Sequence, residues 1–155
     1  MPMPTYELAQ LNLAKIKHPT ADAPEMEDFY AAIESVNQEA ENHPGFVWRW
    51  VEQDAPMDPV RIFGDPLMVV NMSVWESVEA LKDFVYSGKH LGVYKRKKEW
   101  FRSMAENHMV LWWVPQGHRP TLEEAKERLL KLQKEGPQHA AFTFGQQFSP
   151  EFDQV

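Results

Sequence analysis

The 155-residue chain has a composition typical of a globular protein, with 43% hydrophobic and 25% charged residues, which excludes a largely disordered chain. Its formal net charge of −7 argues against a general nucleic-acid binder, because such proteins carry a basic surface. The absence of cysteine excludes disulfides and thiolate metal sites. The longest uncharged apolar run, Met109 to Pro115, is too short to span a membrane, and the chain does not open with a signal-peptide pattern. We therefore expect a cytoplasmic protein.

The first half of the chain predicts a strand, a helix and two further strands. Apolar and polar residues alternate from Tyr6 to Ile16, as in a strand whose side chains point to opposite faces. Asp22 and Glu25 form a capping-box pair ahead of apolar residues at helical spacing, and the helix so predicted ends at His43-Pro44-Gly45. Further strands are predicted over 46–51 and over 67–75, the latter apolar on both faces, with a short extended segment at 60–63.

The second half predicts two helical regions, a strand and a C-terminal helix. Ser77 can cap the first helix, and a further helical stretch over 89–104 carries a run of basic residues. Thr121 and Glu124 form a second capping box, which opens a helix that Gly136-Pro137 ends. A doubly buried strand is predicted over 109–114, a short strand over 141–144, and a loose tail over 149–155.

The resulting order of strand, helix, strand, strand, helix, strand is the ferredoxin-like βαββαβ pattern of the α+β class, here with an extra C-terminal helix. We expect one domain over 1–155, with an ordered core over 6–145. Two helices cover one face of such a sheet, yet the third and fourth strands are apolar on both faces. The second face is covered either by the C-terminal helix or by a second copy; we favour the second copy, which gives a homodimer forming a dimeric α+β barrel.

Several sequence strings resemble a bacterial family of unknown function, numbered 3291. They are LAQLNLAKIK (8–17), NHPGFVWRW (42–50), VNMSVWESVEALKDFVYSGKH (70–90), KRKKEWF (95–101) and VLWWVPQGHRPTLEEAKERL (110–129). The resemblance covers nearly the whole chain and implies a dimeric α+β barrel.

More distantly, the chain is similar to the antibiotic-biosynthesis and haem-degrading monooxygenases of the same superfamily. In the haem-degrading group, an Asn on the first strand, a Trp ending the third strand and a His on the following helix form the site. Asn12 and Trp75 occupy similar places, while His90 follows Trp75 by fifteen residues and Tyr94 lies nearer the position of the ligand. The resemblance leaves two alternatives for the cofactor, none or haem.

Polar residues on otherwise apolar strands are the first candidates for a site. Gln10, Asn12, Asn71 and Ser73 would point into the barrel if Val70, Met72 and Val74 face the helices. A barrel that binds a ligand would explain them, and so would mutual hydrogen bonds between neighbouring strands, since a buried amide needs partners.

Tryptophans could line a pocket for a flat aromatic molecule, and core packing is their alternative role. The candidates are Trp48, Trp50, Trp75, Trp112 and Trp113. Only one of Trp112 and Trp113 can line the pocket, because adjacent strand residues face opposite ways.

His90 and Tyr94 are four residues apart, so they share one helical face. They could supply an acid/base group beside a phenol, or an axial haem ligand; a structural His bonded to the Tyr or to backbone is the alternative. The histidine spacings do not match a zinc site. The basic run (Lys95, Arg96, Lys97, Lys98, Arg102) could hold an anion, and a solvated helix face is the favoured interpretation.

These features predict a monooxygenase-like enzyme that acts on a small, hydrophobic aromatic substrate. Asn12 and Asn71 would orient polar atoms, Gln10, Ser73, Trp48 and Trp112 would help to bind the substrate, Trp75 would hold its ring, and His90 or Tyr94 would move a proton or bind haem. The alternative is a non-catalytic dimeric module that binds a small molecule or haem, and whether the chain is an enzyme at all is left open. A purely structural dimer is a third interpretation.

Overall fold

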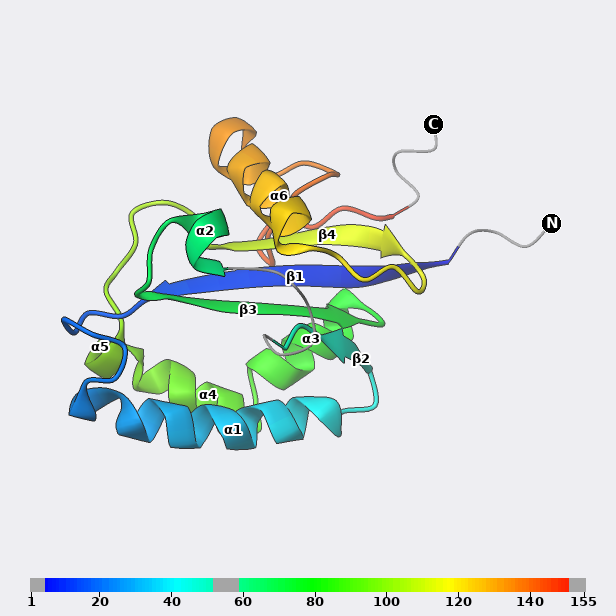
Figure 1. Cartoon of the computed structure of the whole chain (residues 1–155). Helices are drawn as coiled ribbons and strands as arrows, with labels where there is room; N and C mark the ends of the chain where they lie inside the picture. Colours follow the sequence, from blue (N-terminus) through cyan, green and yellow to red (C-terminus); the bar gives the residue numbers. More distant parts are fainter. Residues whose placement is uncertain (1–4, 52–58, 151–155) are drawn as a thin grey trace.

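The computed structural model describes residues 5–51 and 59–150. A four-stranded sheet with the strand order β2-β3-β1-β4 lies at the centre (Figure 1). All of its neighbouring strands are antiparallel, which is the ferredoxin-like arrangement predicted from the sequence. The strands are β1 (Tyr6–Lys15), β2 (Phe46–Arg49), β3 (Met68–Trp75) and β4 (Met109–Pro115).

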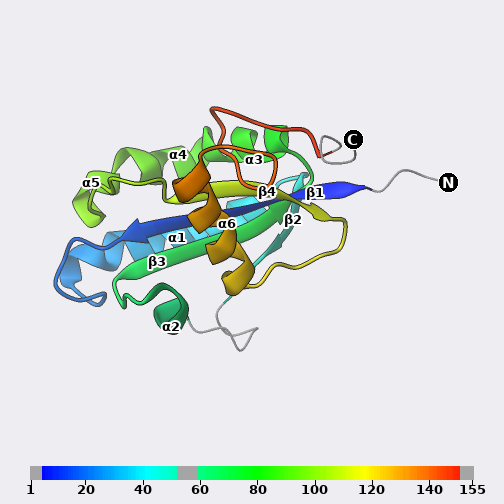
Figure 2. The same ribbon diagram turned by 90° about the horizontal axis from the view of Figure 1, so that it is seen from above.

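Helices cover both faces of the sheet. Figure 1 shows α1, α3 and α4 on one side and α2 and α6 on the other, and Figure 2 shows α6 crossing over the sheet. The helices are the 3₁₀ turn η1 (Pro24–Met26), α1 (Glu27–Glu41), α2 (Pro59–Phe63), α3 (Val78–Val85), α4 (Gly88–Lys95), α5 (Lys97–Trp100) and α6 (Leu122–Glu135). No helix in the described ranges is long and apolar enough to cross a bilayer.

The C-terminal helix covers the second face of the sheet, the less favoured of the two sequence-based alternatives. Ala9 and Val74 from the strands pack in one cluster with Leu122 and Leu129 of α6. Ala9, Val74 and Leu122 are completely buried, with 0% exposure, although no second chain is present. The burial of apolar residues on both faces of β4 is therefore explained within a single chain.

Two of the three predicted helix caps are confirmed. The Ser77 hydroxyl accepts the Ala80 N–H at 3.1 Å and begins α3, and the Thr121 hydroxyl accepts the Glu124 N–H at 3.1 Å and begins α6. The prediction of a capping box at Asp22 is wrong. The helical segment opens with η1, whose N-cap is Ala23 with no side-chain hydrogen bond, so the chain enters α1 through a 3₁₀ turn.

Three predicted segments differ in the structure. The segment at 60–63 belongs to the short helix α2, which starts at Pro59 and stops before Gly64 at φ +73°. The helix predicted over 89–104 breaks at Arg96 and ends at Trp100, because the Arg102 N–H donates to the carbonyl of Lys15, the last residue of β1. The strand predicted over 141–144 is reduced to isolated bridges at Ala141, Phe142 and Thr143, of which only that between Phe142 and Leu111 reaches β4. Of the predicted tail, residues 151–155 lie outside the described ranges.

Candidate functional site

The polar side chains of the two central strands lie together. Gln10 is directly opposite Ser73, and Asn12 is directly opposite Asn71. The alternation of the strands places these four side chains on the same face as Trp75, toward α1, α3 and α4. The prediction that they point into a barrel interior away from these helices is therefore wrong. The apolar alternates of β3, Val70, Met72 and Val74, face α2 and α6 instead.

We call these four side chains (Gln10, Asn12, Asn71 and Ser73) the polar belt. In its inner half, Gln10 and Ser73 form hydrogen bonds with each other and with neighbouring side chains. The Gln10 Nε2 donates to Asn71 Oδ1 at 2.6 Å and to Ser73 Oγ at 2.8 Å. The Ser73 Oγ also accepts the Trp75 indole N–H at 2.8 Å. Gln10 is 4% exposed and Ser73 is 6% exposed, so both side chains are structural parts of the core.

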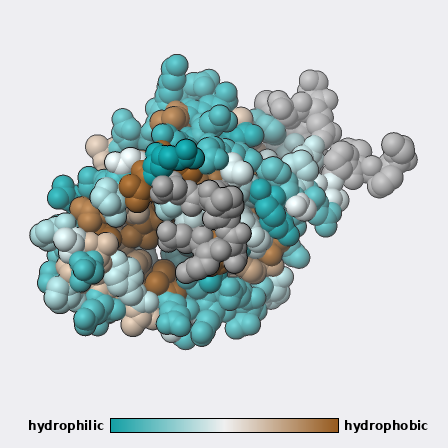
Figure 3. Space-filling model, in the orientation of Figure 1, coloured by the Kyte–Doolittle hydropathy of each residue, from teal (hydrophilic) through white to brown (hydrophobic). Residues whose placement is uncertain are grey.

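The outer half of the belt is open. Asn71 is exposed and Asn12 is half-buried, although both lie on the inner side of the sheet. Within the described residues, the Asn12 amide makes no side-chain hydrogen bond, and the Asn71 amide is bound only through its oxygen. Figure 3 shows a hollow with hydrophobic side chains around it between β3 and the helical layer. The two amide groups can therefore offer N–H donors to a molecule that enters there.

Trp75 is a core residue. Its side chain is 1% exposed and stacks on Phe84 with ring centroids 5.1 Å apart. Phe46 and His43 meet its ring edge to face, with centroids at 5.5 and 5.4 Å. The resemblance implies a haem held against Trp75. This packing leaves no room beside Trp75 for a planar macrocycle, so the residues do not fit a haem there.

His90 lies at the start of α4, with its ring against Phe84 at 5.3 Å. The Nδ1 lies 3.0 Å from the Val85 carbonyl, which can only accept, so Nδ1 carries the proton and Nε2 is left as an acceptor when the ring is neutral. Burial lowers the pKa of His90, with the Val85 carbonyl and the Glu39 carboxylate opposing the shift. His90 is therefore a neutral imidazole that can accept a proton. It is connected to the polar belt through the rings of Phe84 and Trp75.

Tyr94 lies at the protein surface. Its side chain is 52% exposed, and the Lys97 ammonium lies 4.1 Å above its ring. This cation–π contact holds the phenol at the protein surface. Tyr94 is therefore not placed to bind a ligand between the sheet and the helices.

Trp48 and Trp112 lie on the opposite face of the sheet, with α6. The Trp112 indole donates to the Glu124 carboxylate at 3.0 Å, and the Arg119 guanidinium is 6.0 Å from the Trp48 ring. Trp113 is the member of its pair that faces the belt side, where its indole donates to the Phe148 carbonyl at 2.7 Å. Trp48 and Trp112 therefore cannot share one pocket with Trp75.

Sequence reasoning missed His43, which contacts the Trp75 and Phe84 rings. Its Nε2 lies 2.9 Å from the Asp83 carboxylate, and its Nδ1 accepts the Gly45 N–H at 3.0 Å. No local pattern connects residues 43 and 83. Only the helix-ending His-Pro-Gly motif marked this position, and that motif indicates a turn.

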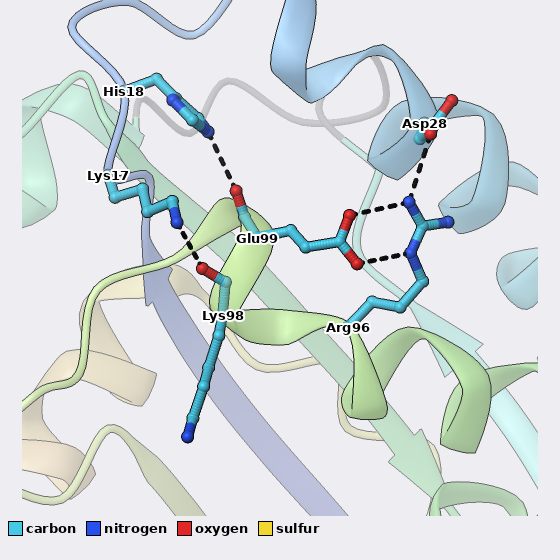
Figure 4. A network of polar contacts seen from close by, with 6 residues as sticks. All are labelled: Lys17, His18, Asp28, Arg96, Lys98 and Glu99. Carbon is cyan, nitrogen blue, oxygen red and sulfur yellow. Dashed lines mark hydrogen bonds and ion pairs between the residues drawn. The ribbon is translucent and has the colours of Figure 1, made fainter.

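The basic run is a solvated, ion-paired surface, as favoured from the sequence. Figure 4 shows the Arg96 guanidinium between the carboxylates of Glu99 and Asp28, at N–O distances of 2.8 and 3.2 Å. Arg96 lowers the pKa of the Glu99 carboxyl through these hydrogen bonds. Nearby, the Lys17 ammonium and His18 bind the backbone carbonyls of Lys98 and Glu99. In the part of the chain that the structure describes, no group of three acidic or histidine side chains could hold a metal ion.

The fold is similar to that of several solved proteins. A conserved protein from Methanosarcina mazei Go1 has a TM-score of 0.50 at 12% identity, over 71% of this chain and 92% of its own. A protein from Shewanella oneidensis has a TM-score of 0.50 at 10% identity, over 74% and 95%. An antibiotic biosynthesis monooxygenase has a TM-score of 0.45 at 16% identity, over 73% and 99%. At these identities the likeness of the first two shows the fold alone.

Comparison of the sequence with protein-family models identifies the family. No curated protein matches this chain significantly. The model of one protein family, described as "Domain of unknown function (DUF3291)", matches residues 7–155. That range includes every strand and helix described above except the first residue of β1. The chain therefore belongs to the DUF3291 family.

Proposed function

We propose that this chain is a small-molecule enzyme, monooxygenase-like, that acts on a hydrophobic aromatic molecule bearing oxygen atoms. The substrate enters between β3 and the layer of α1 and α4. The observation that carries the proposal is the Asn12–Asn71 pair, two opposed amides on the inner side of the sheet whose N–H donors have no acceptor among the described residues.

The chemistry of the pair favours a substrate with carbonyl or hydroxyl oxygens. Gln10 fixes the oxygen of the Asn71 amide, so the Asn71 N–H groups are turned away from Gln10 and are available to a ligand. Asn12 supplies a second donor from the neighbouring strand. Two donors on adjacent strands would fix the orientation of a flat molecule whose apolar body lies against the helices.

His90 is the group proposed to move a proton. Its Nε2 is free to accept, because Nδ1 donates to the Val85 carbonyl. A neutral imidazole that takes the proton of a ring hydroxyl leaves an electron-rich phenolate. Dioxygen would be the oxidant: one of its oxygen atoms would be added to the ring, which is oxidised from phenol to quinone, and the other would leave as water. Asn12 and Asn71 would hold a second oxygen of the substrate, at the end away from His90, because the rings of Phe84 and Trp75 lie between His90 and the amides.

Oxygen uptake with a panel of polycyclic phenols and hydroxyquinones tests the proposal. Asn12→Leu and Asn71→Leu keep the side-chain volume and remove the donors, so we expect turnover to fall by about threefold to tenfold for each, the effect of losing one hydrogen bond to the substrate. Asn107→Leu, in the exposed loop before β4, is the matched control and should keep full activity. A ligand-free crystal with both amides bonded to protein and no space beside them would contradict the proposal.

The second candidate function is a module that binds such a molecule without changing it. The closed bonds of Gln10, Ser73 and Trp75, and the distance of His90 from the amides along a chain of rings, favour it. It predicts that the ligand raises the melting temperature without turnover, and that His90→Ala binds as tightly as the natural chain. If the chain is an enzyme, by contrast, the ligand is turned over.

We also propose that the chain acts as a cytoplasmic homodimer. The side of the sheet that carries α2 and α6 has half-buried apolar residues. A second copy could cover these groups. The half-buried residues are Val47, Trp48, Trp50, Phe63, Met68 and Val70.

A further inference from the structure

The helix α4 buries no side chain, although it lies in the helical layer that covers one face of the sheet (Figure 1). The helix α3 of the same layer also has eight residues, and it buries Val78, Leu81 and Phe84. In α4, Val93 is half-buried and packs against two clusters of the core. A segment with so few buried contacts opens at a lower free-energy cost than the rest of a fold.

Gly92 weakens α4 further. It lies inside the helix without a positive φ, and a Cβ built there would meet nothing within 4 Å. Neither the backbone conformation nor the packing therefore requires glycine at this position. Glycine inside a helix lowers its stability relative to alanine, because the unfolded segment has more conformational freedom to lose. The chain thus keeps a weak helix where a stronger one would fit.

The two ends of α4 are suited to act as hinges. The helix begins at Gly88, whose φ of +56° lies in the left-handed region that glycine adopts without steric cost. It stops at Arg96, whose φ of −97° and ψ of 6° separate α4 from α5. Hinges of moving segments are residues at the ends of elements that absorb a change in φ and ψ.

A weak polar contact at each end holds α4 against α1. At its start, the Lys89 backbone N–H donates to the Glu39 carboxylate at 3.3 Å. Just after its last residue, the Arg96 guanidinium donates to the Asp28 carboxylate at 3.2 Å. The Asp28 side chain is 74% exposed, and ion pairs in water contribute little to stability. The closed position of α4 therefore depends on Val93 and on contacts that break at low cost.

The inner face of the sheet lies beneath α4. Val93 packs in the same cluster as Met109 of β4, and Met109 is directly opposite Asn12 of the polar belt. The helix also carries His90, whose ring lies against Phe84. Opening α4 would lift His90 from Phe84 and uncover the face of the sheet that carries the belt.

We propose that α4 is a lid, which opens by local unfolding between Gly88 and Arg96 and admits a molecule to the inner face of the sheet. Gly92 sets how often the lid is open, and the Glu39 carboxylate helps to hold it closed. The identity of that molecule as a substrate rests on the function proposed above, whereas the opening of α4 does not.

Native-state amide exchange of the full chain, followed by NMR, measures the opening. We expect the amides of 91–95 to exchange together, at least about a hundredfold faster than those inside α1. Gly92→Ala should slow the exchange of α4 alone by about twofold to fivefold, the effect of its higher helix propensity. Exchange of α4 as slow as that of α1, or exchange that does not respond to Gly92→Ala, would overturn the proposal.

The contact with α1 has its own pair of variants. Glu39→Ala should speed the exchange of α4 by about twofold to tenfold, the effect of losing one hydrogen bond. Glu34→Ala, at an exposed position of the same helix, is the matched control and should leave the exchange unchanged. Equal effects of the two variants would contradict the role of Glu39.

A single thiol can report whether the lid covers the sheet, because the chain has no cysteine. Met109→Cys places a thiol on the inner face, and Ser103→Cys places one in the exposed loop before β4. Gly92→Ala should slow the reaction of the first thiol with iodoacetamide by the factor found for amide exchange, and should not affect the second. A thiol at position 109 that reacts equally fast in both backgrounds would show that α4 is not the lid. Failure of every phenol to bind would instead count against the inner-site function alone.

Discussion

Ser73 is the residue on which the polar belt depends, since its single hydroxyl oxygen accepts N–H groups from both Gln10 and Trp75. Removing the oxygen leaves two donors without that acceptor, in surroundings closed to water. We predict that Ser73→Ala lowers the free energy of unfolding by about 1–3 kcal/mol. Urea denaturation measures this, with Ser103→Ala as an exposed control expected to stay close to the natural chain. A loss no larger than that of the control would contradict the importance of these bonds.

His90 should make stability depend on pH below neutrality. Burial holds its pKa in the folded chain below the ordinary value, so the unfolded chain binds the proton first as pH falls below about 6.5. The free energy of unfolding should therefore decline as pH falls through that window, and level off below the folded pKa. His90→Gln should flatten the decline in urea denaturation, whereas His108→Gln, in an exposed loop, should keep it. Parallel pH profiles for the natural chain and His90→Gln would refute this.

The strand spacing was enough to group Gln10, Asn71 and Ser73, because side chains two apart share a face and the two strands are neighbours. It did not determine which helices cover that face. Helical spacing likewise placed Tyr94 on the same side of the helix as His90, but it did not determine which of the two lies against the core. Packing of Val93 toward the core sets the rotation of the helix about its axis and leaves Tyr94 in solvent.

Among the elements, the caps of the helices give a direct comparison of two similar sequence motifs. Thr121 accepts the Glu124 N–H at 3.1 Å, while no side chain caps η1 near Asp22. We predict that Thr121→Ala lowers the free energy of unfolding by about 1 kcal/mol, and that Asp22→Ala changes it by less than about 0.5 kcal/mol. Thermal or urea denaturation of both variants measures the difference. Equal losses would contradict the capping difference.

The long elements with strong periodicity were predicted well, and the short ones were not. β1, α1 and α6 each bury a regular stripe, so sequence alone indicates their type. α2 has five residues, too few to show a helical period, and Phe142 is buried by one bridge to β4 rather than by a strand of its own. In both cases contacts with distant elements determine the local structure.

On the scale of the whole molecule, the sequence indicated the ferredoxin-like order of elements and the need to cover two faces of the sheet, but not what covers the second face. The α6 stripe of Leu122, Leu129 and Leu132 was visible as amphipathic. An amphipathic stripe does not say whether it packs on its own sheet or on another chain, because both bury the same area. Contact with β4 in the same chain resolves the question.

The proposed homodimer predicts a mass twice the 18.1 kDa of one chain in sedimentation experiments. Trp48→Ser should shift the equilibrium toward the single chain, because it removes apolar surface from the side of α2 and α6. Tyr86→Ser, which removes an aromatic ring of 56% exposure from the opposite layer, should leave the mass unchanged. A mass of 18.1 kDa for the natural chain at high concentration would exclude the dimer.

The bridge between Leu111 and Phe142 limits the pairing of β4 with strands of other molecules. β4 forms an outer edge of the sheet, and an exposed edge is a template for strands of other molecules. Both backbone groups of Leu111 are taken by Phe142, with two N–O distances of 2.9 Å, in the middle of that edge. The other edge, β2, is only four residues long and carries an irregular register against β3. Neither edge offers a long row of free backbone groups, which protects this four-stranded sheet from aggregation by strand addition.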